Sequence, residues 1–263
     1  MSLPLAGIGP SVRWAVVLVL LPPSETKSTG GDGGPLDLGD LSMPQLTETR
    51  ELLVRALVEL AADYDASSRA LGLGANGADE IERNAKLWVS PTRPALERYT
   101  GVLFDALDAA RFTKVQREKA YRRLAVGSAL FGAVRASDPI PAYRLSGGSK
   151  LPGFGTLAAL WRPELTDALV AEAGDDLVVD LRSGAYQQLG PVPGAITATV
   201  LTEKPDGTRS VVSHFNKHHK GLLARALVQT RAEPADVRGL ARVASKAGLR
   251  VEIASPTELV VLT

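Results

Sequence analysis

The segment from Pro22 to Lys27 combines a carboxylate, two hydroxyls and an amine directly after a strongly apolar run. Open mixed sheets commonly bind ligands where a central strand ends, so these polar side chains can line a cleft. Burial would raise the pKa of Glu25 and suit it to general acid or base catalysis, and Lys27 can hold a phosphate as a point charge. A solvated turn is the simpler interpretation of the same residues.

A second group of charged and small residues forms the loop from Tyr143 to Lys150. Its glycines and serines leave backbone N–H groups accessible, and Arg144 and Lys150 add positive charge, which together suit an oxyanion or a phosphate. The spacing of Gly, Lys and Ser does not match a P-loop, and no Ser or Thr that could bind Mg²⁺ follows the lysine. The loop is therefore a candidate anion site without a Walker signature.

The next five residues, Leu151 to Gly155, resemble the hairpin of helix-hairpin-helix DNA-binding modules. A glycine-rich turn of this kind offers backbone N–H groups to a phosphate, and a helix that begins after it would reinforce the attraction. The segment before the hairpin is not clearly helical, so an ordinary Pro-Gly turn is the alternative.

A third group lies from Asp180 to Tyr186, where a predicted strand ends. It offers a carboxylate, a guanidinium, the Ser183 hydroxyl and the Tyr186 phenol within one turn, which makes it a candidate site edge. The alternative is a strand-to-turn junction in which Asp180 pairs with Arg182 or with a backbone amide.

The segment from His214 to Arg225 holds all three histidines and a local excess of cations. If it is helical from Asn216, Lys217, Lys220 and Gly221 share one face that Arg225 extends, which would direct several cations into one groove. A metal site at the histidines lacks a carboxylate close in sequence, so we expect none. A solvated basic helix start is the alternative.

The composition limits the kinds of binding site and reaction that the chain can support. Thirty Lys and Arg against 29 Asp and Glu give a formal charge of +1, so any anion site must come from local clustering. The chain has no cysteine, which excludes disulfides, thiolate nucleophiles and Cys-ligated metals. It also lacks the Gly-x-Ser-x-Gly, Gly-x-Gly-x-x-Gly and His-Glu-x-x-His motifs, and with 5% aromatics it is poor in base-stacking residues.

The N-terminal apolar run, Trp14 to Leu21, is too short to cross a bilayer and reads as a buried central strand. Residues 1–13 are predicted to be a loose extension without a secretory cleavage site, so we expect a cytoplasmic protein that binds no membrane. With 263 residues the remaining chain, 14–263, can form a single large domain, or two closely packed lobes.

Helices and strands must position these groups. The pattern predicts a helix after Ser42 with Gln45 as its capping-box partner, helices at 78–89 and 114–124, the latter capped by Thr113 and Gln116, and a buried segment at 126–134. Further on it predicts helices at 156–161, 165–173 and from about 217 to 231, and strands at 177–181, 196–201, 210–215, 250–253 and 258–262. Asp206-Gly207 predicts a hairpin turn, and the second half is expected to be mostly antiparallel.

Taken in order, several short segments resemble the YaaA family, which is linked to peroxide-stress resistance, from Val16 to the C-terminus. The resembling residues are Leu41-Ser42, Pro44 to Arg50, Tyr99 to Gly101, Phe131-Gly132, Tyr143 to Leu145, Gly148, Lys150-Leu151, Trp161, Ser183, Tyr186, Phe215, Lys217, Gly221, Ala224 and Arg225.

The resemblance implies an α+β fold: one large mixed-sheet domain with surrounding helices, a helix-hairpin-helix-like element and a positively charged cleft. It also implies affinity for duplex DNA and a role in limiting iron-dependent oxidative damage. It places seven residues in the cleft: Tyr143, Arg144, Lys150, Ser183, Tyr186, Lys217 and Arg225. Many relatives read Ser-Pro-Ala-Lys in the first loop, where this chain has Glu25 with Lys27 further on, so its site charge differs.

Two functions are favoured at this point, and a regulatory or scaffold protein with a vestigial cleft is a third alternative. The first is a DNA-binding stress protein whose cations meet phosphates with little sequence preference. The second is an enzyme on a nucleotide-like or other anionic small molecule, with Glu25, Ser183 or Tyr186 transferring protons and Lys27, Arg144, Lys150, Lys217, Lys220 and Arg225 holding charge. We expect no cofactor and a monomer, and the sequence leaves the substrate or the preferred DNA structure open.

Overall fold

The structure of the chain is a computed structural model that describes residues 17–74, 77–204, 206–210 and 213–263, without the side chains of 213–215. The predicted extension of residues 1–13, and Trp14 to Val16, lie outside the described residues. In chain order the elements are β1 Leu18–Leu21, η1 Leu38–Asp40, η2 Pro44–Leu46, α1 Thr47–Leu60, α2 Tyr64–Leu71, α3 Ala78–Ala85, β2 Arg93–Pro94, α4 Ala95–Arg98, α5 Val102–Leu107, η3 Ala109–Arg111, α6 Lys114–Arg123, β3 Leu124–Ser128, β4 Gly132–Arg135, β5 Pro139–Ile140, α7 Leu157–Ala173, β6 Val178–Asp180, α8 Gly184–Gln187, β7 Ile196–Glu203, β8 Arg209–Ser210, α9 Ser213–Gln229, α10 Val237–Lys246, β9 Arg250–Ser255 and β10 Glu258–Leu262.

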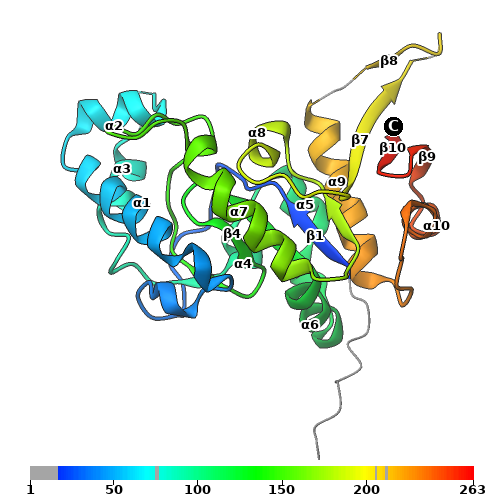
Figure 1. The fold of residues 1–263 in the computed structure, drawn as a ribbon, viewed down its shortest axis with the longest axis horizontal. Helices are drawn as coiled ribbons and strands as arrows, with labels where there is room; N and C mark the ends of the chain where they lie inside the picture. Colours follow the sequence, from blue (N-terminus) through cyan, green and yellow to red (C-terminus); the bar gives the residue numbers. More distant parts are fainter. Residues whose placement is uncertain (1–16, 75–76, 205, 211–212) are drawn as a thin grey trace, which may run out of the picture.

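One large mixed sheet organises these elements. Its strands follow the order β4-β3-β1-β6-β7-β10-β9, and β8 pairs with β7 as the eighth strand, while β2 and β5 form a small separate sheet. Helices surround the large sheet on both faces (Figure 1). The predicted mixed-sheet architecture with surrounding helices is confirmed.

Strand β1 lies at the centre because it is apolar on both faces. All four of its residues are buried, as expected for a strand covered on both sides. It pairs in parallel with β3 on one side and with β6 on the other. The central position predicted from the apolar run is confirmed.

The expectation of a mostly antiparallel second half is wrong. Strands β6 and β7 are parallel, and so are β7 and β10. Within the described residues of this half, the antiparallel pairs are those of β9 and β8, and β8 ends at Ser210. The predicted strand at 210–215 fails because α9 begins at Ser213, and Val211 and Val212 lie outside the described residues.

The helices form two layers. In Figure 1, α7 lies on the viewer's side of the sheet, while α5 and α9 lie behind it. Helices α5 and α9 pack closely because α9 carries Gly221, where an added Cβ would lie 2.3 Å from the Leu103 carbonyl oxygen of α5. Helices α1, α2 and α3 lie together at one end of the molecule, and β9, β10 and α10 lie at the other (Figure 1). No helix within the described ranges has the length and apolarity needed to cross a membrane.

Two of the predicted helix boundaries are corrected by tertiary contacts. Ser42 does not cap α1, since its hydroxyl and backbone N–H both donate to the buried Asp138 carboxylate, at 2.7 and 3.0 Å. The helices predicted at 156–161 and 165–173 are one helix, α7, which runs through Pro163. The capping box of Thr113 and Gln116 at the start of α6 is confirmed.

The helix-hairpin-helix element predicted at Leu151 to Gly155 is not observed there. The segment between β5 and α7 is irregular in the structure, so the hairpin has a helix after it and none directly before it. A pair of short helices joined by a glycine-rich connection does occur elsewhere, in α2 and α3. Gly72 ends α2 in the left-handed conformation that glycine adopts without strain, and Gly77 precedes α3.

Four fully buried arginines tie irregular segments to this framework: Arg50, Arg98, Arg123 and Arg182. Arg98 donates to the carbonyl oxygens of Ile140 at 3.0 Å, Ser28 at 2.5 Å, Gly30 at 2.8 Å and Pro91 at 3.1 Å. It therefore joins the long loop after β1 to the small β2–β5 sheet. Burial lowers the pKa of Arg98 to about 10, so it remains charged near neutral pH.

We expect Arg98→Met to lower the free energy of unfolding by about 3 kcal/mol, because four carbonyl oxygens lose their donor. Urea denaturation followed by circular dichroism measures this loss. Arg55→Met is the matched control, since Arg55 is 71% exposed and pairs only with Glu51 on the same helix. The control should change stability by less than about 0.5 kcal/mol. Equal effects of the two variants would contradict the anchoring role of Arg98.

Candidate functional site at the strand ends

A pocket of about 530 Å³ lies where β1 and β6 end. Because these neighbouring strands are parallel, their carboxyl ends open at the same edge of the sheet, which is the usual ligand position in such folds. We call this cavity the strand-end pocket. It is lined by Pro22, Pro23, Glu25, Leu181, Arg182, Ser183, Gly184, Tyr186, Gln187, Thr197, Ala198, Thr199, Asn216, Lys217 and Lys220.

A buried ion pair forms part of the wall of the strand-end pocket. Arg182 donates to both carboxylate oxygens of Asp180, at 2.9 and 2.8 Å, and also to the Gly190 carbonyl oxygen at 2.8 Å. Both charges are almost fully buried, so they compensate each other locally. The pair therefore shapes the pocket and leaves its net charge to other residues.

The first turn of α9 supplies positive charge. Asn216 and Lys217 line the pocket near the start of α9, where the helix dipole favours an anion. Lys217 is exposed and has no ion-pair partner among the described residues. Lys220, half-buried one turn later, donates to the Leu181 carbonyl oxygen at 3.0 Å. Burial lowers the pKa of Lys220.

An ion pair and a phenol close the side of the pocket nearest the β1 loop. The Glu25 carboxylate lies 2.9 Å from the guanidinium of Arg144. The Tyr186 hydroxyl accepts the backbone N–H of Gly147 at 3.1 Å, which joins the Tyr143–Lys150 loop to α8. Burial, followed by the nearby Glu25 charge, raises the pKa of Tyr186 well above its usual value. Tyr186 is therefore a neutral hydrogen-bond donor and a poor base.

Lys27 lies behind this loop, against two aromatic rings. Its Nζ is 4.1 Å from the ring centre of Tyr143 and 5.3 Å from that of Tyr99, and it donates to the Ser24 carbonyl oxygen at 3.0 Å. Burial lowers the pKa of Lys27 to about 8. The two tyrosine hydroxyls bond to each other at 2.7 Å, and Tyr143 also meets the Ser128 hydroxyl at 2.8 Å.

The structure brings most of the predicted site residues together. Those that line the strand-end pocket are Glu25, Ser183, Tyr186, Lys217 and Lys220. Arg144 reaches the pocket through Glu25, while Lys27 and the buried Tyr143 lie behind the same loop.

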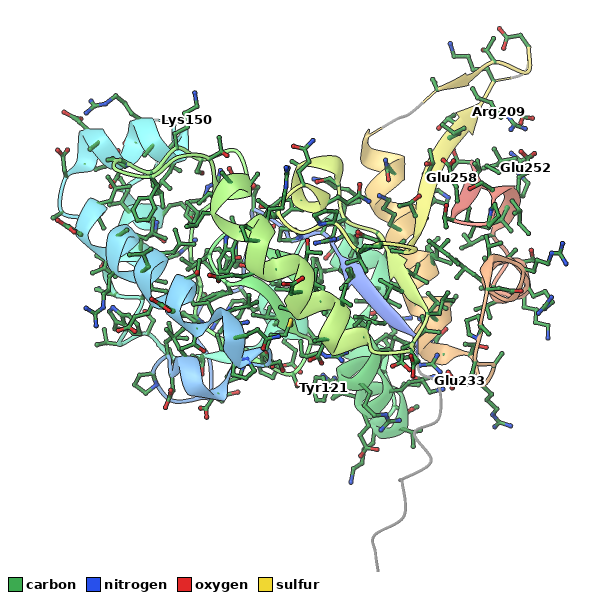
Figure 2. All side chains as sticks on the ribbon, viewed as in Figure 1. Tyr121, Lys150, Arg209, Glu233, Glu252 and Glu258 are labelled. Atoms are coloured by element: carbon green, nitrogen blue, oxygen red, sulfur yellow. The ribbon has the colours of Figure 1, made fainter. Side chains whose placement is uncertain are left out.

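Two predicted cations lie apart from the pocket. Lys150 is exposed beside α2, where its backbone N–H donates to the Ala70 carbonyl oxygen, and Figure 2 shows it at the end of the molecule that holds α1, α2 and α3. Arg225 pairs with Asp108 at the end of α5, at 3.2 Å. The basic face expected to run from Lys217 to Arg225 is therefore split, since Gly221 packs on α5.

Sequence reasoning missed part of the site. Thr197 and Thr199 contribute one polar face of β7, and their alternation with apolar residues is a signal that the sequence does carry. The contact of Tyr99 with Lys27 carries no such signal, because it depends on an isolated bridge between two irregular segments.

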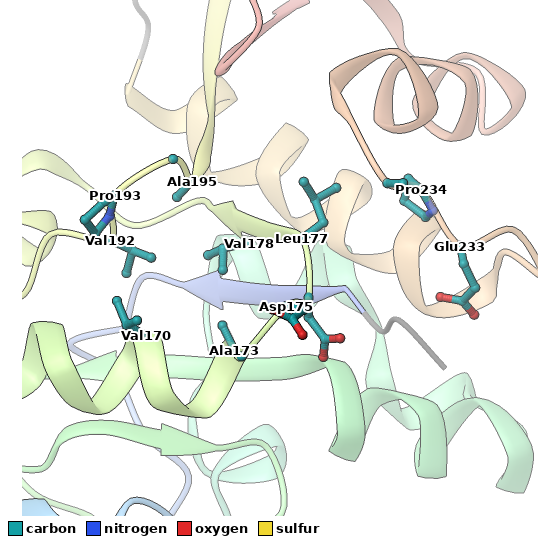
Figure 3. Close-up of a pocket in the computed structure, with 14 residues that line it drawn as sticks. Val170, Ala173, Asp175, Leu177, Val178, Val192, Pro193, Ala195, Glu233 and Pro234 are labelled. Atoms are coloured by element: carbon teal, nitrogen blue, oxygen red, sulfur yellow. The ribbon is translucent and has the colours of Figure 1, made fainter. Parts of the chain in front are cut away.

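A second cavity, of about 300 Å³, lies at the opposite end of β6 and differs in charge. Its charged side chains are the carboxylates Asp175, Asp176 and Glu233, among apolar residues such as Val170 and Leu177 (Figure 3). Glu233 also pairs with the buried Arg123. Carboxylates repel phosphate, so this cavity is a poor site for a nucleotide-like anion.

Metal-binding side chains do not gather in the described parts of the chain: no group of three or more His, Asp or Glu is placed to hold an ion. The rings of His218 and His219 meet edge to face, with centres 5.3 Å apart. The side chain of His214 lies outside the described residues.

Comparison with known proteins shows similarity over nearly the whole chain. A family model described as peroxide stress protein YaaA matches residues 17–253. A UPF0246 protein of Corynebacterium efficiens is 52% identical over 241 residues, which cover 90% of this chain and 95% of the relative. A UPF0246 protein of Streptomyces coelicolor is 44% identical and covers 92% of this chain and 94% of its own length. One from Shewanella loihica is 28% identical, over 82% of this chain and 86% of the relative.

We expect the Lys27 amine to titrate with a midpoint near pH 8 in the folded protein. Trace acetylation with acetic anhydride, followed by peptide mass spectrometry, measures it, because only the unprotonated amine that forms above the pKa reacts. In 8 M urea the midpoint of the same residue should return to about 10.4. Since the unfolded chain then binds this proton more tightly, the contribution of Lys27 to stability should rise from pH 8 to 10.5. A native midpoint above 10 would contradict the buried environment.

Proposed function

The chain belongs to the family of the peroxide stress protein YaaA, and from that premise we propose that it serves the peroxide stress response by binding a phosphate-bearing, nucleotide-like ligand in the strand-end pocket. The protein acts in the cytoplasm as a monomer. Its lack of cysteine suits a reducing compartment, where disulfides do not form.

One observation carries the proposal: the first turn of α9 and two lysines meet at the carboxyl ends of two parallel strands. Helix N-termini bind phosphate through free backbone N–H groups, and the dipole adds to the attraction. Lys217 adds a charge without an ion-pair partner among the residues that the structure describes, and Lys220 adds a second one that is partly withdrawn from water. An ammonium in a partly dry site attracts an anion more strongly than one in bulk solvent.

The size and lining of the pocket suit a compact ligand. A volume of about 530 Å³ falls in the range of ordinary small-molecule sites. Pro22, Pro23 and the half-buried Tyr186 ring provide apolar surface in the lining. The base or sugar of a nucleotide can pack against these apolar groups while its phosphate binds at the start of α9. The formal charge of +1 for the whole chain favours such a focused site over an extended electrostatic footprint.

If the pocket also performs catalysis, Glu25 is the proton acceptor. Ser183 is exposed at the start of α8, and its hydroxyl makes no capping bond. Tyr186 stays protonated and can only donate. If the Glu25→Gln variant keeps its turnover, Glu25 therefore does not transfer a proton in the reaction.

Duplex DNA is the second candidate ligand, and α2 and α3 favour it. Their connection contains Gly72, Gly74 and Gly77, which lack side chains and so let a DNA phosphate approach the backbone closely. Lys150 lies next to the end of α2 and adds positive charge there. A duplex bound at this end of the molecule would not need the strand-end pocket.

For the pocket, we expect Lys217→Ala to weaken mononucleotide binding about tenfold, the cost of one charge-assisted phosphate contact. Isothermal titration calorimetry with AMP and GMP measures the affinity. Lys150→Ala removes an exposed lysine of the same kind away from the pocket and should leave the affinity within about twofold. No nucleotide binding by the wild type, or equal effects of both variants, would overturn the proposal.

For duplex DNA the two variants should behave in the opposite way. Lys150→Ala should weaken binding of a short duplex and reduce the slope of log affinity against log salt by about one, since one phosphate contact is lost. Lys217→Ala should leave that slope unchanged. Fluorescence anisotropy with a labelled duplex at several salt concentrations measures both. A wild-type affinity that does not fall as salt rises would exclude duplex DNA as an electrostatic ligand.

A further inference from the structure

Strand β9 forms one edge of the large sheet. It ends the strand order, and among the described residues it pairs only with β10. The other side of such a strand presents a row of backbone N–H and C=O groups that can bind an added strand. Ile253 of β9 is 46% exposed, so this edge also offers apolar surface.

Helix α10 packs on one face of β9, at the end of the molecule that holds both elements (Figure 1). Only residues 247–249 join the two, so the strand runs back alongside the helix. An open groove of about 640 Å³ lies between them, and we call it the α10 groove. It is lined by Arg238, Ala241, Arg242, Ser245 and Lys246 of α10 and by Val251 and Ile253 of β9.

The helix side of the α10 groove is basic. Arg238, Arg242 and Lys246 recur at every fourth position, which places them on one helix face. All three are exposed, and within the part of the chain that the structure describes none of them has an ion-pair partner. Glu252 belongs to the other face of β9 and pairs with Arg209, at 2.7 Å. The groove therefore offers three cations to an acidic ligand.

The spacing of these cations matches an extended chain. Residues four apart on a helix are about 6 Å apart along its axis, and residues two apart on a strand are separated by about 6.6 Å. Acidic side chains at every second position of an added strand can therefore meet Arg238, Arg242 and Lys246 in turn. Glutamate suits the groove because its methylenes can cover the aliphatic side chains while its carboxylate reaches a guanidinium group.

We propose that the α10 groove binds an extended acidic segment of a partner protein, which adds a strand to β9. The glutamates of this segment, at every second position, pair with the three cations of α10. The groove shares no lining residue with the strand-end pocket, so this inference is independent of the proposed function.

Charge and lining argue against other occupants. A second copy paired through β9 would bring both α10 helices to the same face of the joined sheet, where their cations would repel each other. Residues 1–16 of this chain contain no Asp or Glu, so they do not supply the acidic strand. Single-stranded nucleic acid is also negative, but its bases would find no aromatic ring in the described lining to stack on.

The test is binding of a labelled peptide to the full-length protein, measured by fluorescence anisotropy. The probe consists of about four Glu-Thr repeats, because threonine favours a strand and every second residue is acidic. The control peptide has the same residues in the repeating order Glu-Glu-Thr-Thr, which moves half of the glutamates to the other strand face. We expect the alternating peptide to bind at least about tenfold more tightly.

A pair of matched variants locates the binding site. Arg242→Glu reverses the middle charge of the groove and should weaken binding of the alternating peptide at least about tenfold. Arg69→Glu is the control, since Arg69 is an exposed residue of α2, at the opposite end of the molecule, without an ion-pair partner among the described residues. It should change the affinity by less than about twofold. Circular dichroism checks that both variants fold.

Hydrogen–deuterium exchange tests the pairing with β9. The bound peptide should slow amide exchange in residues 250–255 at least about threefold. A peptide with proline at its centre should neither bind well nor protect these residues, because proline has no N–H to donate.

Equal binding of the two peptides, or equal effects of Arg242→Glu and Arg69→Glu, would overturn the inference. Binding without protection of β9 would overturn it as well, because charge alone would then hold the peptide. A thymidine oligonucleotide that binds more tightly than the peptide and is lost in Arg242→Glu would assign the groove to nucleic acid instead. A dimer in analytical ultracentrifugation that protects β9 without any peptide would assign the edge to a second copy.

Discussion

Buried guanidinium groups that donate to backbone carbonyl oxygens hold this structure together. A buried arginine is costly unless its N–H groups find acceptors, and irregular segments have carbonyl oxygens that no strand or helix satisfies. Arg98 meets this need for Gly30 in the loop after β1 and for Ile140 of β5, and Arg50 meets it for Phe131 in the turn before β4 and for Ala133 of β4. Arg182 does the same beside the pocket through Gly190. The loops that form the site are thus fixed by the same interaction that stabilises the fold.

The sequence predicts those elements whose cause is local. The apolar run of β1 places it at the sheet centre, and Thr113 and Gln116 mark the start of α6 by bonds three residues apart. It cannot predict where a residue distant in the sequence takes the hydrogen-bond donors that a local pattern assigns to a helix cap. Ser42 has the spacing of a helix cap, yet the Asp138 carboxylate takes both of its donors. The parallel order of β6, β7 and β10 also has no local signal, because either strand direction buries the same apolar faces.

The candidate site likewise has a part that local sequence signals predict and a part that they do not. The sequence points to Glu25, Ser183 and Lys217 because polar residues follow predicted strands or begin a helix, and parallel strands do bring them to one edge. Lys150 and Arg225 fit the pattern equally well but lie elsewhere, since charge clustering in sequence does not state which partner a side chain will meet. The contact between Lys27 and the tyrosine rings depends on how two irregular segments cross, which no periodicity encodes.

The position of β1 has a consequence for how the chain reaches its fold. Leu18 pairs with Val178, and Val19 pairs with Leu124, so the first strand gains its neighbours only after most of the chain exists. Parallel pairing across such separations is slow, because a long loop must close before any contact rewards it. During synthesis the apolar segment of β1 is therefore made before its partner strands. Until they exist it stays unpaired, and it can aggregate or be bound by chaperones. The strand that best defines the finished protein is the one least protected while the protein is being made.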